Sequence, residues 1–150
     1  MSGQQCYKQP ESVLVVVHTP DVEVLLIERI CPRGFWQSVT GSLEPGEMPL
    51  QAALRELDEE TGIIVTADEM RDWYQTNRFE ILPEWRARYA PDVMYNIEHV
   101  FSLCLPQRCP IRLSPDEHAG YVWLPQDEAA SKATSWTNRD AILKLTRPAR

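Results

Sequence analysis

Hydrophobic residues along this chain gather in short runs separated by polar, proline-containing or glycine-containing segments. Runs of about four to eight β-branched or aromatic residues are typical of strands. We expect strands at residues 12–18, 22–29, 35–40, 63–66, 73–82, 98–105 and 121–124. The first two flank a Thr-Pro-Asp turn and should form a hairpin or lie as adjacent strands.

Residues 49–61 follow a helical pattern instead. Pro49 suits the first turn of a helix, where its missing N–H is not needed, and Gly62 suits the position just past the end. Four residues then share the face that should pack on a core: Leu50, Leu54, Leu57 and Thr61.

Two further helices are expected at residues 125–133 and 138–145, with Asn138 as the N-cap of the second. Strands mixed with a few helices indicate an α/β (α+β) fold built on a mixed sheet. The sequence contains no repeat, no low-complexity tract and no long linker. We therefore expect one domain over residues 1–150.

Three glutamates lie on one stripe of the helix predicted at 49–61. At ~100° per residue, Glu56 and Glu60 are ~40° apart and Glu59 lies ~60° to the other side of Glu56. Like charges at this spacing destabilise a helix, and two of them lie near its unfavourable C-terminal end. A hard divalent cation such as Mg²⁺ or Mn²⁺ would neutralise them. A solvated acidic face is the alternative, and on these three residues alone it is the favoured interpretation by about two to one.

Composition narrows the class of protein. The net charge of −7 argues against electrostatic nucleic-acid binding. It permits a phosphorylated small molecule if a metal and local cations intervene. The sequence has no membrane-span-length apolar stretch and no secretory segment at its start. Its four cysteines lack metal-ligand spacing, so reduced thiols in the cytoplasm are expected.

The spacing around the helix resembles the Nudix box, in which Gly, Glu, Arg, Glu, Glu, Glu and Gly stand at fixed positions with two aliphatics. The matching residues are Gly41, Glu47, Arg55, Glu56, Glu59, Glu60 and Gly62, with Leu57 and Ile63. A chance match is rarer than about one in a million at ordinary residue usage. The resemblance implies an α/β/α sandwich with a carboxylate-bearing loop–helix–loop. It also implies Mg²⁺-dependent attack of water on a phosphorus atom, with Mn²⁺ as a possible substitute.

Segments outside the box resemble one folate-pathway branch of the Nudix family. They are YKQP at 7–10, FWQSVTGS at 35–42, RYAP at 88–91, EHAGYVWL at 117–124 and SWTNRDAI at 135–142. This resemblance implies hydrolysis of 7,8-dihydroneopterin triphosphate to dihydroneopterin monophosphate and pyrophosphate. It implies neither a nucleic-acid or membrane partner nor an obligate protein partner.

The resemblance also assigns roles to individual residues. The metal ligands would be Glu56, Glu60 and Glu117, together with the backbone carbonyl of Gly41. Glu59 would be a further ligand or the base that deprotonates water, with Glu117 as the other candidate base. Arg55 would orient Glu59 through their i,i+4 pairing, and Glu47 would brace the junction of loop and helix through a salt bridge.

Substrate contacts are expected from a second group of residues. They are Lys8, Arg29, Thr40, Ile81, Leu82, Pro83, Glu84 and Ser135. Lys8 and Arg29 suit phosphate oxygens, and hydroxyl or backbone groups suit the edge of a ring. Trp36 and Trp136 are the preferred stacking candidates, although core packing is the commoner role of tryptophan.

Two other functions compete with this interpretation. One is a housecleaning Nudix hydrolase of nucleoside triphosphates such as dATP or oxidised purine nucleotides, since these also join a bicyclic ring to a triphosphate. The other is a catalytically silent Nudix domain that only binds. Such domains typically lose box glutamates, and this sequence keeps all four.

Overall fold

Strands from both halves of the chain form one mixed sheet in the computed structural model, which describes residues 6–147. The strands are β1 (Glu11–His18), β2 (Glu23–Arg29), β3 (Trp36–Gln37), β4 (Val39–Ser42), β5 (Arg71–Glu80), β6 (Tyr95–Cys104) and β7 (His118–Pro125). The main order is β3-β2-β1-β6-β5, with β4 also paired to β1 and β7 to β2. The pair β1–β6 is parallel and the others are antiparallel, so the sheet is mixed as expected.

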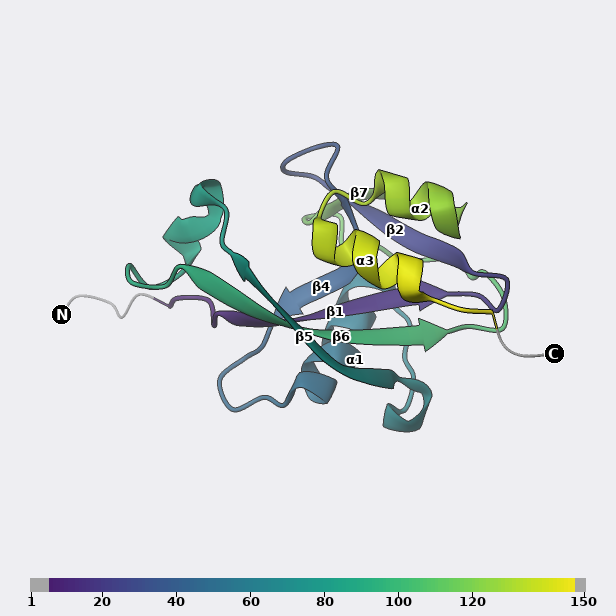
Figure 1. Ribbon diagram of the computed structural model, residues 1–150, viewed down its shortest axis with the longest axis horizontal. Helices are drawn as coiled ribbons and strands as arrows, with labels where there is room; N and C mark the ends of the chain where they lie inside the picture. The colour runs from purple at the N-terminus through teal and green to yellow at the C-terminus, as the bar shows by residue number, and fades with distance from the viewer. Residues whose placement is uncertain (1–5, 148–150) are drawn as a thin grey trace.

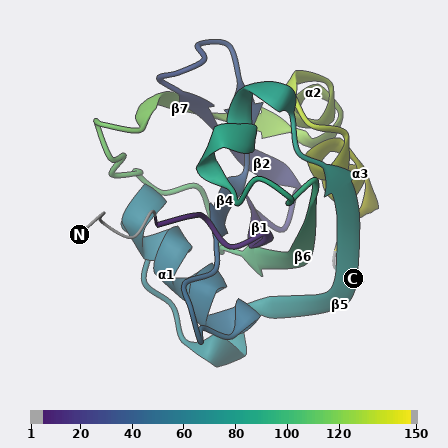
Figure 2. The ribbon, with the colours of Figure 1, turned by 90° about the vertical axis from the view of Figure 1, so that its left-hand side faces the viewer.

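Helices cover both faces of this sheet. They are α1 (Pro49–Thr61), α2 (Gln126–Lys132) and α3 (Trp136–Lys144), with short 3₁₀ turns η1 (Ala67–Glu69) and η2 (Pro83–Arg88). Figures 1 and 2 show α1 on one side of the sheet and α2 with α3 on the other. This arrangement confirms the predicted α/β/α sandwich. Within residues 6–147, no helix has the length and apolar character that a membrane crossing requires.

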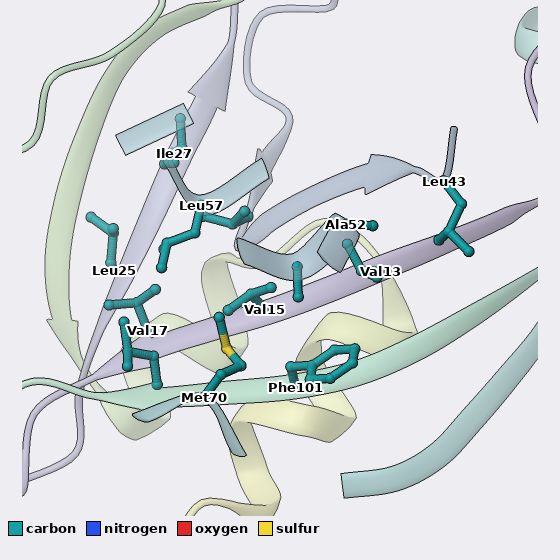
Figure 3. Close-up of a cluster of buried hydrophobic side chains, with 13 residues drawn as sticks. Val13, Val15, Val17, Leu25, Ile27, Leu43, Ala52, Leu57, Met70 and Phe101 are labelled. Atoms are coloured by element: carbon teal, nitrogen blue, oxygen red, sulfur yellow. The ribbon is translucent and has the colours of Figure 1, made fainter. Parts of the chain in front are cut away.

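Strand β1 divides the core into two parts. Val13, Val15 and Val17 face α1, where they pack with Leu57 and Phe101 (Figure 3). Leu14 and Val16 point the other way, toward α2 and α3. The five β1 residues, 13–17, are all buried because both faces of the sheet are covered. This burial on two sides explains why the sequence of β1 is a continuous apolar run.

Helix α1 begins and ends where the sequence predicts. Pro49 occupies its first turn, and Gly62 terminates it in the left-handed conformation with φ of 76°. Leu57 and Thr61 are buried, and Leu50 and Leu54 pack against the same core. The face expected to contact the core is therefore the one that does.

Two strand predictions need correction. Residues 63–66 form no strand, because they have no neighbouring strand with which to share hydrogen bonds, although Ile63 and Val65 pack against the core. Residues 35–40 form two strands and not one. The segment changes partner at Ser38, pairing with β2 before it and with β1 after it.

The N-cap of α3 was also predicted wrongly. Ser135 caps the helix, and its side chain accepts a hydrogen bond from the Asn138 backbone N–H. The Asn138 side chain is buried, where its Oδ1 accepts from Ser38 N–H at 2.7 Å and its Nδ2 donates to Ser38 Oγ at 2.9 Å. Asn138 thus fixes α3 to Ser38, the residue between β3 and β4.

Candidate active site

The last two turns of α1 present a pair of carboxylates toward β4. Glu60 is only 2% exposed, and neither of its carboxylate oxygens has a hydrogen-bond partner among the described residues. Burial, followed by the neighbouring Glu56 carboxylate, raises the pKa of Glu60 well above its ordinary value. Among residues 6–147, the nearest group that could carry positive charge is His118, whose Nε2 lies 3.5 Å from Glu60 Oε1. Burial lowers the pKa of that histidine, so it does not neutralise Glu60 at neutral pH.

Gly41 on β4 leaves the space that the second carboxylate fills. A Cβ at this position would lie 2.2 Å from Cδ of Glu56. The glycine is therefore required here for close approach and not for its backbone angles. Two hard carboxylates, one of them buried without a partner, suit a divalent cation such as Mg²⁺.

The third predicted ligand lies at the edge of this arrangement. Glu117 is exposed and lines the same cavity as Glu56 and Glu60. Among residues 6–147, no three His, Cys, Asp or Glu side chains lie close enough together to hold a metal by themselves. The structure thus offers a carboxylate pair and, in the lining of the same cavity, the exposed Glu117.

Arg55 joins the loop to the helix. Its Nε and Nη2 donate to the Glu47 carboxylate, both at 2.8 Å, and its Nη1 donates to Glu56 Oε1 at 2.7 Å. Nη2 also donates to the Ser42 carbonyl at 3.0 Å. The hydrogen bonds to Glu47 are the main cause of a raised pKa for Arg55, so the guanidinium stays charged. The expected brace between Glu47 and the helix is present, and Arg55 also fixes Glu56.

Glu59 lies away from this pair. It contacts Arg55 at 3.2 Å, as its i,i+4 spacing predicts, but its side chain is 57% exposed. Desolvation and the nearby Glu56 carboxylate raise the pKa of Glu59. Glu59 does not line the cavity that holds Glu56 and Glu60.

The carboxylate pair opens into a cavity of about 550 Å³ that also contains cations. Lys8, Arg29 and Arg88 line it, as do Thr40 and Gly41. The Lys8 backbone N–H donates to the Arg88 carbonyl at 2.8 Å, which fixes the N-terminal segment beside η2. Desolvation and the charges of Arg88 and Arg29 lower the pKa of Lys8. Three crowded cations beside two carboxylates combine the charges that suit phosphate oxygens with oxygen ligands that suit a divalent metal.

A second cavity, also of about 550 Å³, adjoins the first and shares Lys8, Arg29, Thr40 and Arg88 with it. Its walls include Phe35, Phe79, Trp85 and Trp136. The Arg29 guanidinium lies 5.9 Å from the Phe35 ring centre and 5.2 Å from that of Trp85. The two cavities form one cleft, with an aromatic end, a cationic middle and a carboxylate end.

Most of the residues predicted to contact substrate line this cleft. Ile81, Leu82 and Ser135 line its aromatic end. The structure does not bring Pro83 and Glu84 there, because both are exposed at the start of η2. The Thr40 hydroxyl is already used, since it donates to the Val13 carbonyl at 2.9 Å.

The stacking candidates divide in a similar way. Trp136 lines the cleft, whereas Trp36 does not and instead has the Lys132 ammonium 4.4 Å from its ring centre. Sequence reasoning missed Trp85, Asn96 and Glu98. The sequence pattern could have indicated Asn96 and Glu98. They are polar residues on the buried face of β6, which becomes apolar from Val100 onward.

Comparison with known proteins agrees with this geometry. Residues 8–145 match the NUDIX domain model, and the chain therefore belongs to the Nudix family of hydrolases, as the box predicts. Nudix hydrolases generally use a divalent metal and act on nucleotide-like small molecules.

Particular members of the family are similar over almost the whole chain. The chain is 45% identical to dihydroneopterin triphosphate diphosphatase of Escherichia coli over 139 residues, covering 91% of each. It is 37% identical to the Haemophilus influenzae protein of the same name over 141 residues, covering 92% of this chain and 88% of the relative. The solved structure of the E. coli dihydroneopterin triphosphate pyrophosphohydrolase superposes with a TM-score of 0.86 at 44% identity, covering 93% of this chain and 96% of that one.

Proposed function

We propose that this protein hydrolyses 7,8-dihydroneopterin triphosphate to dihydroneopterin monophosphate and pyrophosphate, a step of folate biosynthesis, with Mg²⁺ as cofactor. The observation that carries the proposal is the continuous cleft. Its aromatic end suits a pterin ring, its cations suit a triphosphate, and its carboxylate pair suits a metal. The high identity to two relatives that bear this activity in their names supports the same substrate.

Glu56 and Glu60 are the proposed metal ligands, with Glu117 and the Gly41 carbonyl completing the set. When bound, Mg²⁺ would spread the charge of the triphosphate and polarise the reacting phosphoryl group. Mn²⁺ has similar oxygen-ligand chemistry and can replace it. Arg55 holds Glu56 in position through its hydrogen bond, while Glu47 holds Arg55.

Lys8 and Arg29 are the proposed phosphate contacts, and Arg88 joins them in the shared part of the cleft. Their positive charges offset the repulsion between the substrate and an acidic protein. Ile81, Leu82 and Ser135 contact the ring end, and Thr40 contributes through its backbone.

The attacking water needs a proton acceptor, and two carboxylates compete for that role. Glu117 faces the cavity, whereas Glu59 is exposed and bound to Arg55 outside it. Geometry therefore favours Glu117 over Glu59 as the base, in addition to its proposed place among the metal ligands, and leaves Glu59 as a group that helps to hold Arg55.

The reaction is tested with purified protein, dihydroneopterin triphosphate and Mg²⁺, by following the products. We expect pyrophosphate and the monophosphate, no turnover in excess EDTA, and recovery with Mg²⁺ or Mn²⁺. Glu60→Gln should lower kcat by about a thousandfold or more, because a misplaced metal loses transition-state stabilisation. Orthophosphate as the first product, or a Glu60→Gln enzyme within about tenfold of wild type, would contradict the proposal.

The competing housecleaning activity is tested in the same assay. The quantity to compare is kcat/KM for dihydroneopterin triphosphate against dATP and oxidised purine nucleotides, because that ratio measures specificity. A larger kcat/KM for the pterin substrate supports the proposed role. A larger value for a purine nucleotide would replace it with the housecleaning one.

A further inference from the structure

Polar residues form the floor of the aromatic end of the cleft. On β6, Asn96 and Glu98 occupy the face that continues as apolar core at Val100. On β1, Ser12 occupies the same face ahead of Leu14, and Ser12 is the register partner of Glu98. Ser12, Asn96 and Glu98 all line the cavity, and all are buried. On this shared face of β1 and β6, the residues that line the cavity are polar, whereas those that pack in the core are apolar.

Glu98 is a buried carboxylate without a cation. It is 5% exposed, and its Oε1 accepts a hydrogen bond from Asn77 Nδ2 at 3.3 Å. Within the described part of the chain, no lysine, arginine or histidine forms an ion pair with it, and burial raises the pKa of Glu98. A buried carboxylate is unfavourable unless donors satisfy it. Asn77 and Thr137 are the side chains that donate to it, and because Glu98 lines the cavity, a ligand there can supply further donors.

Asn96 supplies an independent second observation. It is 3% exposed, and its Nδ2 donates to Ser12 Oγ at 2.8 Å. Its Oδ1 is buried and has no partner among the residues described. Unpartnered buried acceptors are rare in folded proteins. Two acceptors on one strand, two residues apart and both lining the cavity, point to a ligand edge that is rich in N–H donors.

We infer that Glu98 and Asn96 recognise the aminopyrimidinone edge of the pterin ring, with the Glu98 carboxylate accepting hydrogen bonds from N3–H and from the 2-amino group. This inference rests on the proposed function and adds the residues that select its substrate. A carboxylate can accept two adjacent donors at once, and charged acceptors make the stronger hydrogen bonds. The ring then lies among Phe35, Trp85 and Trp136, and its triphosphate extends toward Lys8 and Arg29.

A site of this kind rejects rings that lack the donor pair. If the 2-amino group is replaced by a carbonyl, an acceptor faces the carboxylate and the buried group loses a partner. The wild-type protein should therefore bind 7,8-dihydroneopterin at least about tenfold more tightly than its 2-oxo analogue. This comparison needs no variant, so it does not depend on how a substitution affects folding.

The second arm uses Glu98→Gln, which keeps the size of the side chain but replaces one acceptor oxygen with a donor. Binding of 7,8-dihydroneopterin, measured by calorimetry in EDTA, should weaken about 10- to 100-fold. Inhibition by pyrophosphate, which occupies only the phosphate end, should stay within about twofold of wild type. Glu128→Gln, an exposed glutamate on α2, is the matched control and should change neither quantity.

The possible outcomes separate the inference from the function on which it rests. If the wild type does not release pyrophosphate from dihydroneopterin triphosphate, the proposed function fails. If it does, but binds the 2-oxo analogue equally well, the recognition role of Glu98 is wrong while the function stands. A Glu98→Gln protein that loses pterin and pyrophosphate binding to the same extent would also overturn the inference, because that result indicates a structural role.

Discussion

At the scale of single residues, the site depends on the absence of one side chain. Gly41 leaves room for the Glu56 carboxylate, which Arg55 holds from the other side at 2.7 Å. The glycine and the arginine belong to different elements, yet both restrict the same carboxylate. Its position is therefore set by contact from β4 and by an ion pair from within α1.

Gly41→Ala should separate activity from stability. The three atoms nearest to the new methyl group all belong to the Glu56 carboxylate, the end of a flexible side chain, so Glu56 can move aside and the fold should lose at most about 1 kcal/mol. The displaced carboxylate should lower kcat by about 100-fold or more, because small misplacements of reacting groups have large effects. The rate of pyrophosphate release measures the effect on kcat, and thermal unfolding measures the effect on stability.

Gly120→Ala is the matched control for this change. A Cβ at Gly120, which lies on β7, meets nothing within 4 Å, so this variant should keep both activity and stability. Wild-type turnover by Gly41→Ala would show that the position of Glu56 does not matter to the reaction.

At the scale of elements, the N-cap residue of α3 serves two purposes, because Ser135 both caps the helix and lines the cleft. Ser135 lines the aromatic end and also caps the helix by accepting from Asn138 N–H at 3.2 Å. Asn138 reads as a cap in the sequence, but Ser38, 100 residues away, takes its side chain. Local propensity indicated Asn138, but the long-range contact with Ser38 takes the Asn138 side chain and Ser135 caps the helix.

Ser135→Ala should lower the free energy of unfolding by about 1 kcal/mol, the usual effect of losing a capping oxygen. Ser135→Thr keeps that oxygen and should recover most of the loss. Urea denaturation provides the measurement, with Ser131→Ala at an exposed site within α2 as the control. Equal stability of the alanine and threonine variants at position 135 would show that the hydroxyl does not support the helix.

At the scale of the whole molecule, the buried carboxylates make stability depend on pH. Glu98 has a folded-state pKa above its ordinary value of 4.5, so the folded protein holds this proton more tightly than the unfolded chain. Its contribution to stability is therefore fully present below that ordinary value. It is lost as the pH rises through the higher folded-state value.

Glu98→Gln removes this titration. The stability of the wild type relative to the variant should consequently fall as the pH rises above about 4.5, when both are measured without ligand by chemical denaturation. A difference that does not change with pH would mean that Glu98 has the same pKa in both states. The comparison cancels the contributions of the other carboxylates, provided that they do not interact with Glu98.

The sequence by itself determined the features that depend on local geometry. The bounds of α1 follow from Pro49 and Gly62, and the i,i+4 placement of Glu56 and Glu60 follows from the pitch of the helix. The apolar run of β1 follows from burial on both faces of a sheet. For these features, the neighbours in sequence are also the neighbours in space.

Tertiary structure alone decided which distant residues meet. It directed Glu59 outward while burying Glu60, placed Trp85 of η2 over Arg29 of β2, and left residues 63–66 without a partner strand. It also placed Glu98 on the floor of the cleft. These outcomes depend on strand order, register and the packing of helices on the sheet, which join residues far apart in the chain. Periodicity reports which face of an element is buried, but only the assembled sheet determines whether that face meets core, cavity or solvent.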